Sequence, residues 1–191
     1  MKKTFTLLLS IFIFSYLAKG EEEYIMLIGS TLADSSVEKI ITDAGYKVYR
    51  GTGTYTGELS AEKIDSLNKA KLVIFSRNGS SGPHGDGLEE QWADIKAPIL
   101  SLSFWIMRNN RWKWINSASN QCIQSDTIYV TEDGLNHPIF TNIKLGDNNS
   151  IPFTETGITR NESFVATEDV LTGASIKILA FDGVTDDSRV A

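Results

Sequence analysis

Residues 72–82 read LVIFSRNGSSG, four apolar residues followed directly by seven small or polar ones. An apolar run this short, without polar alternation, is typical of a strand that is buried on both faces of a parallel sheet. The polar stretch at 76–82 would then lie at the carboxyl end of that strand, where open α/β sheets bind ligands. The segment therefore predicts an α/β fold and a place for its site.

Similar patterns lie on either side of this segment. Three further apolar runs have the length of strands: 24–29, 47–49 and 99–102. Three stretches between them have helical spacing, and they begin near Asp34 or Ser35, near Ser60 and near Leu88. Strands separated by helices imply crossover connections, and therefore a largely parallel sheet.

The second half of the chain is harder to divide. We expect strands at 127–131, 164–167 and 176–181, and a short helix or ordered loop at 104–114. Residues 189–191 follow a turn-like segment and resemble the start of a strand. The chain could therefore be a fragment of a longer protein, truncated at the C-terminus.

Residues 1–20 predict a secretory signal peptide. Lys2 and Lys3 precede an apolar run at 5–17, and small residues suited to cleavage follow it. The run is shorter than the roughly 20 residues that span a bilayer, although an uncleaved anchor is the alternative. We therefore expect 21–191 to be a single α/β domain outside the cytoplasm (periplasm, cell surface or extracellular space), without a membrane span after cleavage.

Composition narrows the classes of partner and cofactor. The net charge of −6, which becomes more negative when the signal lysines are removed, argues against nucleic acid. Cys122 is the only cysteine, which rules out an intramolecular disulfide, and with only His84 and His137 beside it a zinc site has poor support. The glycine spacing fits neither a P-loop nor a dinucleotide fingerprint, so we predict no metal and no cofactor.

The order of parts resembles the class I glutamine amidotransferase-like superfamily. Residues 71–75 with the loop after them are similar to that family's third strand and turn. The stretch 97–105, APILSLSFW, is similar to the family's P-I-L-G-I-C-x-G, and 136–140, NHPIF, to a His-Pro-apolar turn. The resemblance implies a flavodoxin-like three-layer sandwich with a mainly parallel central sheet.

The departures from that family concern its chemistry. Ser103 stands where the family has its nucleophilic cysteine, and Ser101 and Trp105 stand where it has the two glycines of a tight elbow. A serine would need a base, and only His84 or His137 could serve, the latter more simply a turn residue. The resemblance therefore implies a secreted member without amidotransferase activity and assigns no catalytic residue.

Two segments are candidates for binding a ligand. The loop 76–82 leaves backbone N–H groups accessible, and the stretch 104–114, FWIMRNNRWKW, could stack against a sugar ring or hold a carboxylate. The candidate ligand-binding residues are Ser76, Arg77, Asn78, Ser80, Ser81, Ser103, Trp105, Arg108 and Arg111. The alternatives are a plain connecting loop, and arginines that pair with Asp or Glu while the tryptophans pack in the core.

These observations favour an accessory module that binds a small molecule or glycan, or that helps to organise a larger extracellular protein. Further domains of a longer chain would then be its partners. One alternative is an extracytoplasmic hydrolase that acts on a glycan or ester through Ser103 or a carboxylate. The other is a structural or adhesive module.

Overall fold

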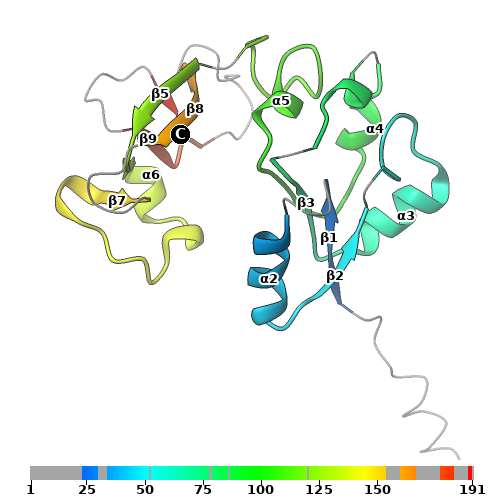
Figure 1. Ribbon diagram of the computed structural model, residues 1–191, viewed down its shortest axis with the longest axis horizontal. Helices are drawn as coiled ribbons and strands as arrows, with labels where there is room; N and C mark the ends of the chain where they lie inside the picture. The colour runs from blue at the N-terminus through cyan, green and yellow to red at the C-terminus, as the bar shows by residue number, and fades with distance from the viewer. Residues whose placement is uncertain are drawn as a thin grey trace, which may run out of the picture.

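The computed structural model describes residues 23–29, 34–51, 53–77, 79–85, 87–119, 121–153, 160–166, 177–182 and 189–190. Four parallel strands and their helices come first, and two small antiparallel sheets follow (Figure 1). The predicted signal segment, residues 1–20, lies outside the described residues.

The first part alternates strands and helices as the sequence predicts. Its elements are β1 (Tyr24–Ile28), α2 (Ser35–Asp43), β2 (Lys47–Arg50), α3 (Ala61–Lys69), β3 (Leu72–Phe75), η1 (Gly82–His84), α4 (Glu89–Ala93), β4 (Ile99–Ser101) and α5 (Phe104–Met107). The four strands predicted here are confirmed to within a residue at their ends. Ser60 caps α3 as predicted, because its side chain accepts a hydrogen bond from the Lys63 backbone at 3.4 Å.

The four strands form one sheet in the order β2-β1-β3-β4, and every neighbouring pair is parallel. The chain thus moves from β1 to one side for β2, then returns to the other side of β1 for β3. The chain therefore adds strands in opposite directions from β1, and the point at which the direction changes lies between β1 and β3. These two strands form the centre of the sheet.

Alternate strand residues point to opposite faces of this sheet, and both faces are covered by helices. Ile41 of α2 packs on one face against Ile25, Leu27 and Ile74. The other face is larger and packs against α3 and α4; its buried members include Met26, Val73, Phe75, Leu67 and Trp92. The first part is therefore an α/β structure with helices on both faces of a parallel sheet (Figure 1).

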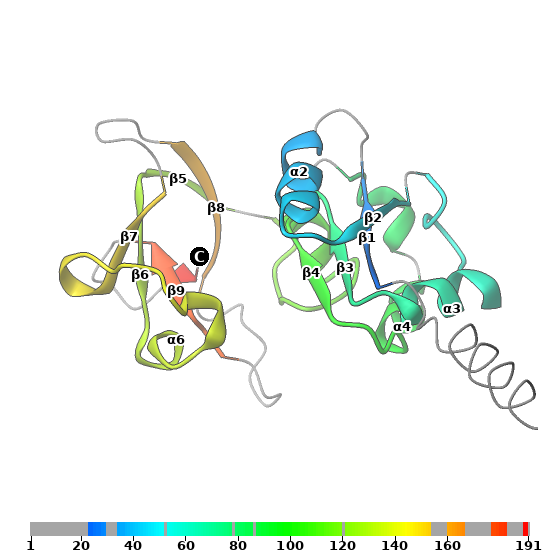
Figure 2. The ribbon, with the colours of Figure 1, turned by 90° about the horizontal axis from the view of Figure 1, so that it is seen from below.

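The second part is antiparallel, so the parallel sheet is confined to the first half of the chain. β5 (Gln121–Ser125) and β10 (Arg189–Val190) flank β8 (Arg160–Ala166). β7 (Ser150–Pro152) and β9 (Ala180–Asp182) flank β6 (Thr127–Val130), as Figure 2 shows from another side. Three short helices complete this part: α6 (Glu132–Leu135), η2 (Pro138–Phe140) and η3 (Asp147–Asn149).

Two strand predictions in this part were wrong at one end. The strand expected at 176–181 begins only at Ala180, because the backbone before it binds the start of α6 instead. Thr131 donates through Oγ1 to the Ile178 carbonyl at 2.6 Å and through its N–H to the Leu179 carbonyl at 3.0 Å. The strand expected at 164–167 begins earlier, at Arg160, because its pairing with β5 extends to Ser125.

Within the described residues, no helix combines the length and the apolar character that crossing a membrane requires.

Candidate functional site

The candidate residues follow the carboxyl ends of neighbouring strands. The Ser76 N–H donates to the Ile28 carbonyl, and the Leu102 N–H donates to the Phe75 carbonyl, both at 2.8 Å. These bonds place the loops after β1, β3 and β4 at one edge of the sheet. Ligands of open α/β sheets bind at such an edge, at the point where strand order reverses.

A buried polar pair lies at this reversal point. The Ser76 hydroxyl donates a hydrogen bond to Oδ1 of Asp34, and both side chains are at least 98% buried. Gly29 fits against them because it has no side chain: a Cβ there would lie 2.9 Å from Asp34 Oδ2. Asp34 precedes α2 as predicted, but its side chain does not cap that helix. It joins the loop after β1 to the loop after β3 instead.

The loop after β3 turns back on itself. The Gly79 N–H donates to the Ser76 carbonyl at 3.2 Å, and the His84 N–H donates to the Ser81 carbonyl at 3.1 Å. Arg77 and Ser80 are exposed, and Ser81 is half-buried. The predicted site residue Asn78 lies outside the described residues.

Arg108 is held in place entirely by neutral oxygens. Its Nε donates to the Trp105 carbonyl at 3.0 Å, its Nη1 to the Ala118 carbonyl at 3.1 Å and its Nη2 to the Ser81 hydroxyl at 3.2 Å. Its guanidinium carbon lies 4.8 Å from the centre of the Trp105 ring. This geometry leaves a second N–H on each terminal nitrogen. Two predicted segments, 76–82 and 104–114, therefore meet through Ser81 and Arg108.

Arg111 lies beside Arg108 and next to the same loop. Its Nη1 donates to the Asn110 carbonyl at 2.6 Å, and a Cβ on Gly85 would lie 2.9 Å from that Nη1. Partial burial, and then the positive charge of Arg111, lower the pKa of Arg108 below its ordinary value. Two guanidinium groups thus repel one another where an anion would relieve the repulsion.

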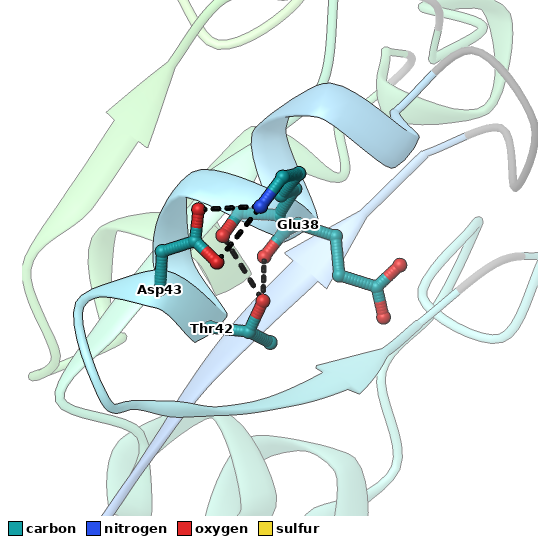
Figure 3. A network of polar contacts seen from close by, with 4 residues as sticks. Glu38, Thr42 and Asp43 are labelled. Carbon is teal, nitrogen blue, oxygen red and sulfur yellow. Dashed lines mark hydrogen bonds and ion pairs between the residues drawn. The ribbon is translucent and has the colours of Figure 1, made fainter.

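The expectation that Arg108 and Arg111 pair with Asp or Glu was wrong within the described part of the chain. The carboxylates with a known cation partner use other cations: Glu38 pairs with Arg50, and Glu89 with Lys113. On α2, Asp43 pairs with Lys39 at 2.7 Å beside the Thr42 hydroxyl, which donates to the Glu38 carbonyl (Figure 3). Neither arginine therefore has a carboxylate partner among the described residues.

An aromatic cluster lies beneath Arg111, on the face of the sheet that α3 and α4 cover. The ring of Phe75 stands edge-to-face with those of Trp92 and Trp112, at centroid distances of 4.8 and 4.6 Å, and with that of His84 at 5.5 Å. Burial, and then the charge of Arg111, lower the pKa of His84 below its ordinary value. Both causes favour the neutral form of the His84 side chain over the charged form.

The tryptophans divide into two groups. Trp92 and Trp112 are buried, whereas Trp105 and Trp114 are 44% and 39% exposed. The prediction that tryptophans pack as core is thus right for the first pair. Trp105, which covers one side of the Arg108 guanidinium, still presents indole surface to solvent.

Ser103 does not have the surroundings of a nucleophile. It is 99% buried, and among the described residues its Oγ has no hydrogen-bond partner. The predicted base candidates also lie elsewhere: His84 is enclosed by aromatic rings, and His137 accepts from the Ile139 N–H at 3.3 Å in a turn. The expected turn role of His137 is confirmed.

Two residues of this region were not singled out as site residues in the sequence. Asp34 was identified only as a helix start, and His84 only as a base. Both are buried polar residues next to predicted site residues, but that proximity depends on contacts across the sheet. Among the described residues, no group of three or more His, Cys, Asp or Glu side chains is placed to hold a metal ion.

Comparison with known proteins assigns the chain to no family. No family model matches it, and no curated protein and no solved structure is significantly similar to it.

Proposed function

We propose that the chain is a ligand-binding module that takes a small organic anion at the carboxyl edge of its parallel sheet. The observation that carries this proposal is the state of Arg108: a guanidinium fixed by three neutral oxygens, with no carboxylate among its described partners. Fixing a guanidinium in advance lowers the entropy cost of binding an anion.

The surroundings of Arg108 favour an acidic sugar over other organic anions. Guanidinium N–H groups bind a carboxylate by two parallel hydrogen bonds. The exposed ring of Trp105 beside it offers an apolar face on which a sugar ring packs. A uronic acid carries both complementary groups, the carboxylate and the ring.

The alternative of a hydrolase that acts through Ser103 has less support. A serine nucleophile needs a base within hydrogen-bond reach, and Ser103 Oγ has no such partner in the described part of the chain. A purely structural module would pair its arginines with carboxylates, and the described contacts of Arg108 and Arg111 contain no such pair.

The finer fold and the location belong to the same proposal. We place the first part among flavodoxin-like three-layer sandwiches, because the order β2-β1-β3-β4 matches the first four strands of the 2-1-3-4-5 order. The signal pattern of residues 1–20 supports a secreted protein. That 21–191 forms a single domain remains a prediction.

Calorimetric titration of the full chain with glucuronate and with glucose tests the function. We expect glucuronate to bind and glucose to bind at least about tenfold more weakly, because charge-assisted hydrogen bonds are worth about 1.5–3 kcal/mol. Arg108→Gln should remove this preference. Lys144→Gln is the control for loss of a positive charge, since Lys144 is exposed in the second part of the chain and is not one of the candidate site residues. Equal affinity for both sugars, or binding to neither, would contradict the proposal.

A further inference from the structure

Four buried nitrogen atoms lack a hydrogen-bond partner in one small region of the first part. They are His84 Nδ1, Trp92 Nε1, Arg111 Nε and Trp112 Nε1, and no described residue satisfies any of them. Nearly all buried polar groups in folded proteins have a partner, so each exception calls for an explanation, such as a bound water, ion or ligand. We call these four side chains the donor cluster.

The members of the donor cluster are close neighbours. The ring centroids of Trp92 and Trp112 are 5.0 Å apart, and that of His84 lies 5.8 Å from the first and 6.1 Å from the second. The charge of Arg111 acts directly on His84. The three ring side chains are at least 95% buried, so bulk solvent does not reach their unpaired nitrogen atoms.

The chemistry of the donor cluster is one-sided. Indole and guanidinium nitrogens donate hydrogen bonds and accept none, and a neutral histidine donates through one ring nitrogen. Among the described residues the cluster has no carboxylate partner, and its one side-chain hydrogen bond to an acceptor is from Arg111 Nη1 to the Asn110 carbonyl. What the two indoles and Arg111 lack is therefore an acceptor, and the charge of Arg111 favours an acceptor that carries negative charge.

The absence of a side chain at Gly85 leaves room for the Arg111 guanidinium beside the donor cluster. Gly85 is buried, and a Cβ on it would lie 2.9 Å both from Arg111 Nη1 and from the Asn110 carbonyl oxygen. Any larger residue at 85 would push the guanidinium away from His84. Phe75 lies edge-to-face with all three rings. Its apolar ring keeps the local dielectric low, which strengthens the electrostatic attraction between the cluster and an anion.

We infer that the donor cluster is a buried binding site for a small oxyanion, either a free ion or the carboxylate of a larger ligand. Arg111 lies beside Arg108, but none of the cluster members is a partner in the three hydrogen bonds that fix Arg108, so the cluster offers donors that the Arg108 site does not use. The inference therefore does not depend on the proposed function. The two indole N–H groups and Arg111 would supply the hydrogen bonds to the anion oxygens.

The indole N–H resonances of the full chain provide a direct test. The protein has four tryptophans, so a proton–nitrogen correlation spectrum gives four indole signals, which single Trp→Phe variants assign. Acetate and phosphate are titrated at constant ionic strength, with sodium chloride as the balancing salt. We expect the signals of Trp92 and Trp112 to move downfield and saturate, with shifts larger than those seen with chloride alone.

Variants separate the cluster from its surroundings. Trp112→Phe keeps the ring and removes one donor, and should weaken anion binding about fivefold, as read from the Trp92 signal. Trp114→Phe is the matched control and should leave the affinity unchanged. If Trp112→Phe does not fold, the wild-type titration decides by itself. A response of Trp92 and Trp112 no larger than that seen with chloride would overturn the inference, and would mean that an internal water satisfies the cluster.

The two proposals fail in different ways. If the wild-type indole signals respond to acetate and Arg108→Gln responds equally, the donor cluster binds anions whatever becomes of the glucuronate experiment. If glucuronate binding depends on Arg108 while Trp92 and Trp112 remain unaffected by every anion, the proposed function stands and the donor cluster is not an anion site.

Discussion

The Ser76 hydroxyl donates a hydrogen bond to the Asp34 carboxylate across the two central strands, 42 residues apart in sequence. Both side chains are buried. Ser76→Ala would leave Asp34 Oδ1 without this donor, and such a loss costs about 1–3 kcal/mol. We expect the free energy of unfolding in urea to fall by that amount. Ser80→Ala, in the exposed part of the same loop, should change it by less than about 0.5 kcal/mol. Equal effects of both substitutions would show that the pair contributes nothing.

Ser103, which follows the next strand of the sheet, should respond to an alanine substitution in the opposite way to Ser76. Its Oγ is buried, and no hydrogen bond from a described residue satisfies it. Replacing it with alanine removes a hydroxyl that is desolvated without compensation. We therefore expect Ser103→Ala to leave the free energy of unfolding unchanged or to raise it, with urea denaturation as the measurement. A loss as large as that of Ser76→Ala would mean that Ser103 has a partner in solution.

Gly29 should tolerate no side chain. A Cβ at this position would lie 2.9 Å from Asp34 Oδ2, and it would also collide with Ser76. Overpacking of this kind costs about 1–3 kcal/mol, so Gly29→Ala should lower the midpoint of urea unfolding clearly. Gly82→Ala is the control, because its nearest contact would be an ordinary 3.7 Å from Ser80 Oγ. Similar midpoints for the two variants would contradict this packing.

His84 should make the stability of the protein depend on pH. Burial and Arg111 lower the pKa of the folded state below the ordinary 6.5, so the unfolded chain binds more protons on acidification. The contribution of the uncharged His84 side chain to the free energy of unfolding is complete above about pH 6.5. It is lost as the pH falls from there to the lower pKa of His84 in the folded state. Urea unfolding at pH 7.5 and pH 5 should thus show a larger decrease for the wild type than for His84→Phe. Parallel decreases would rule out a titrating His84.

Trp105 should contribute to the affinity for glucuronate rather than to the stability of the fold. It is 44% exposed, and stacking by an aromatic ring is worth about 0.5–1.5 kcal/mol. Trp105→Ala should therefore weaken glucuronate binding about threefold to tenfold in calorimetry and leave glucose binding weak. Thermal unfolding checks the fold, and Ile40→Ala, at an exposed position on α2, is the control for loss of surface apolar area. Unchanged glucuronate affinity would remove Trp105 from the site.

The elements of the first half could be predicted from the sequence because their signals are local. The four-residue apolar run of β3 and the cap at Ser60 depend only on neighbouring residues. The meeting of the loops after β3 and β4 could also be predicted, since parallel strands end at one edge. The bond between Ser81 and Arg108, 27 residues apart, joins these two loops, although the rule does not predict the bond itself.

The partners of the arginines could not be predicted in the same way. Arg108 reaches the Ala118 carbonyl because the chain after α5 folds back, with the Asn109 N–H bonded to the Ser117 carbonyl at 3.0 Å. This return has no periodic pattern in the sequence. The apolar run at 176–181 was misread for a related reason: its pattern does not show that Thr131 takes the Ile178 carbonyl. The family resemblance remains a prediction.

The strand order of the parallel sheet has a consequence for synthesis of the chain. β1, the first strand to be made, lies at the centre; β2 adds to one side of it, β3 to the other, and β4 to the outer side of β3. Each new strand therefore finds its hydrogen-bonding neighbour already present, and none must be inserted between two earlier ones. The sheet can grow outward in the order in which its strands leave the ribosome or a translocation channel.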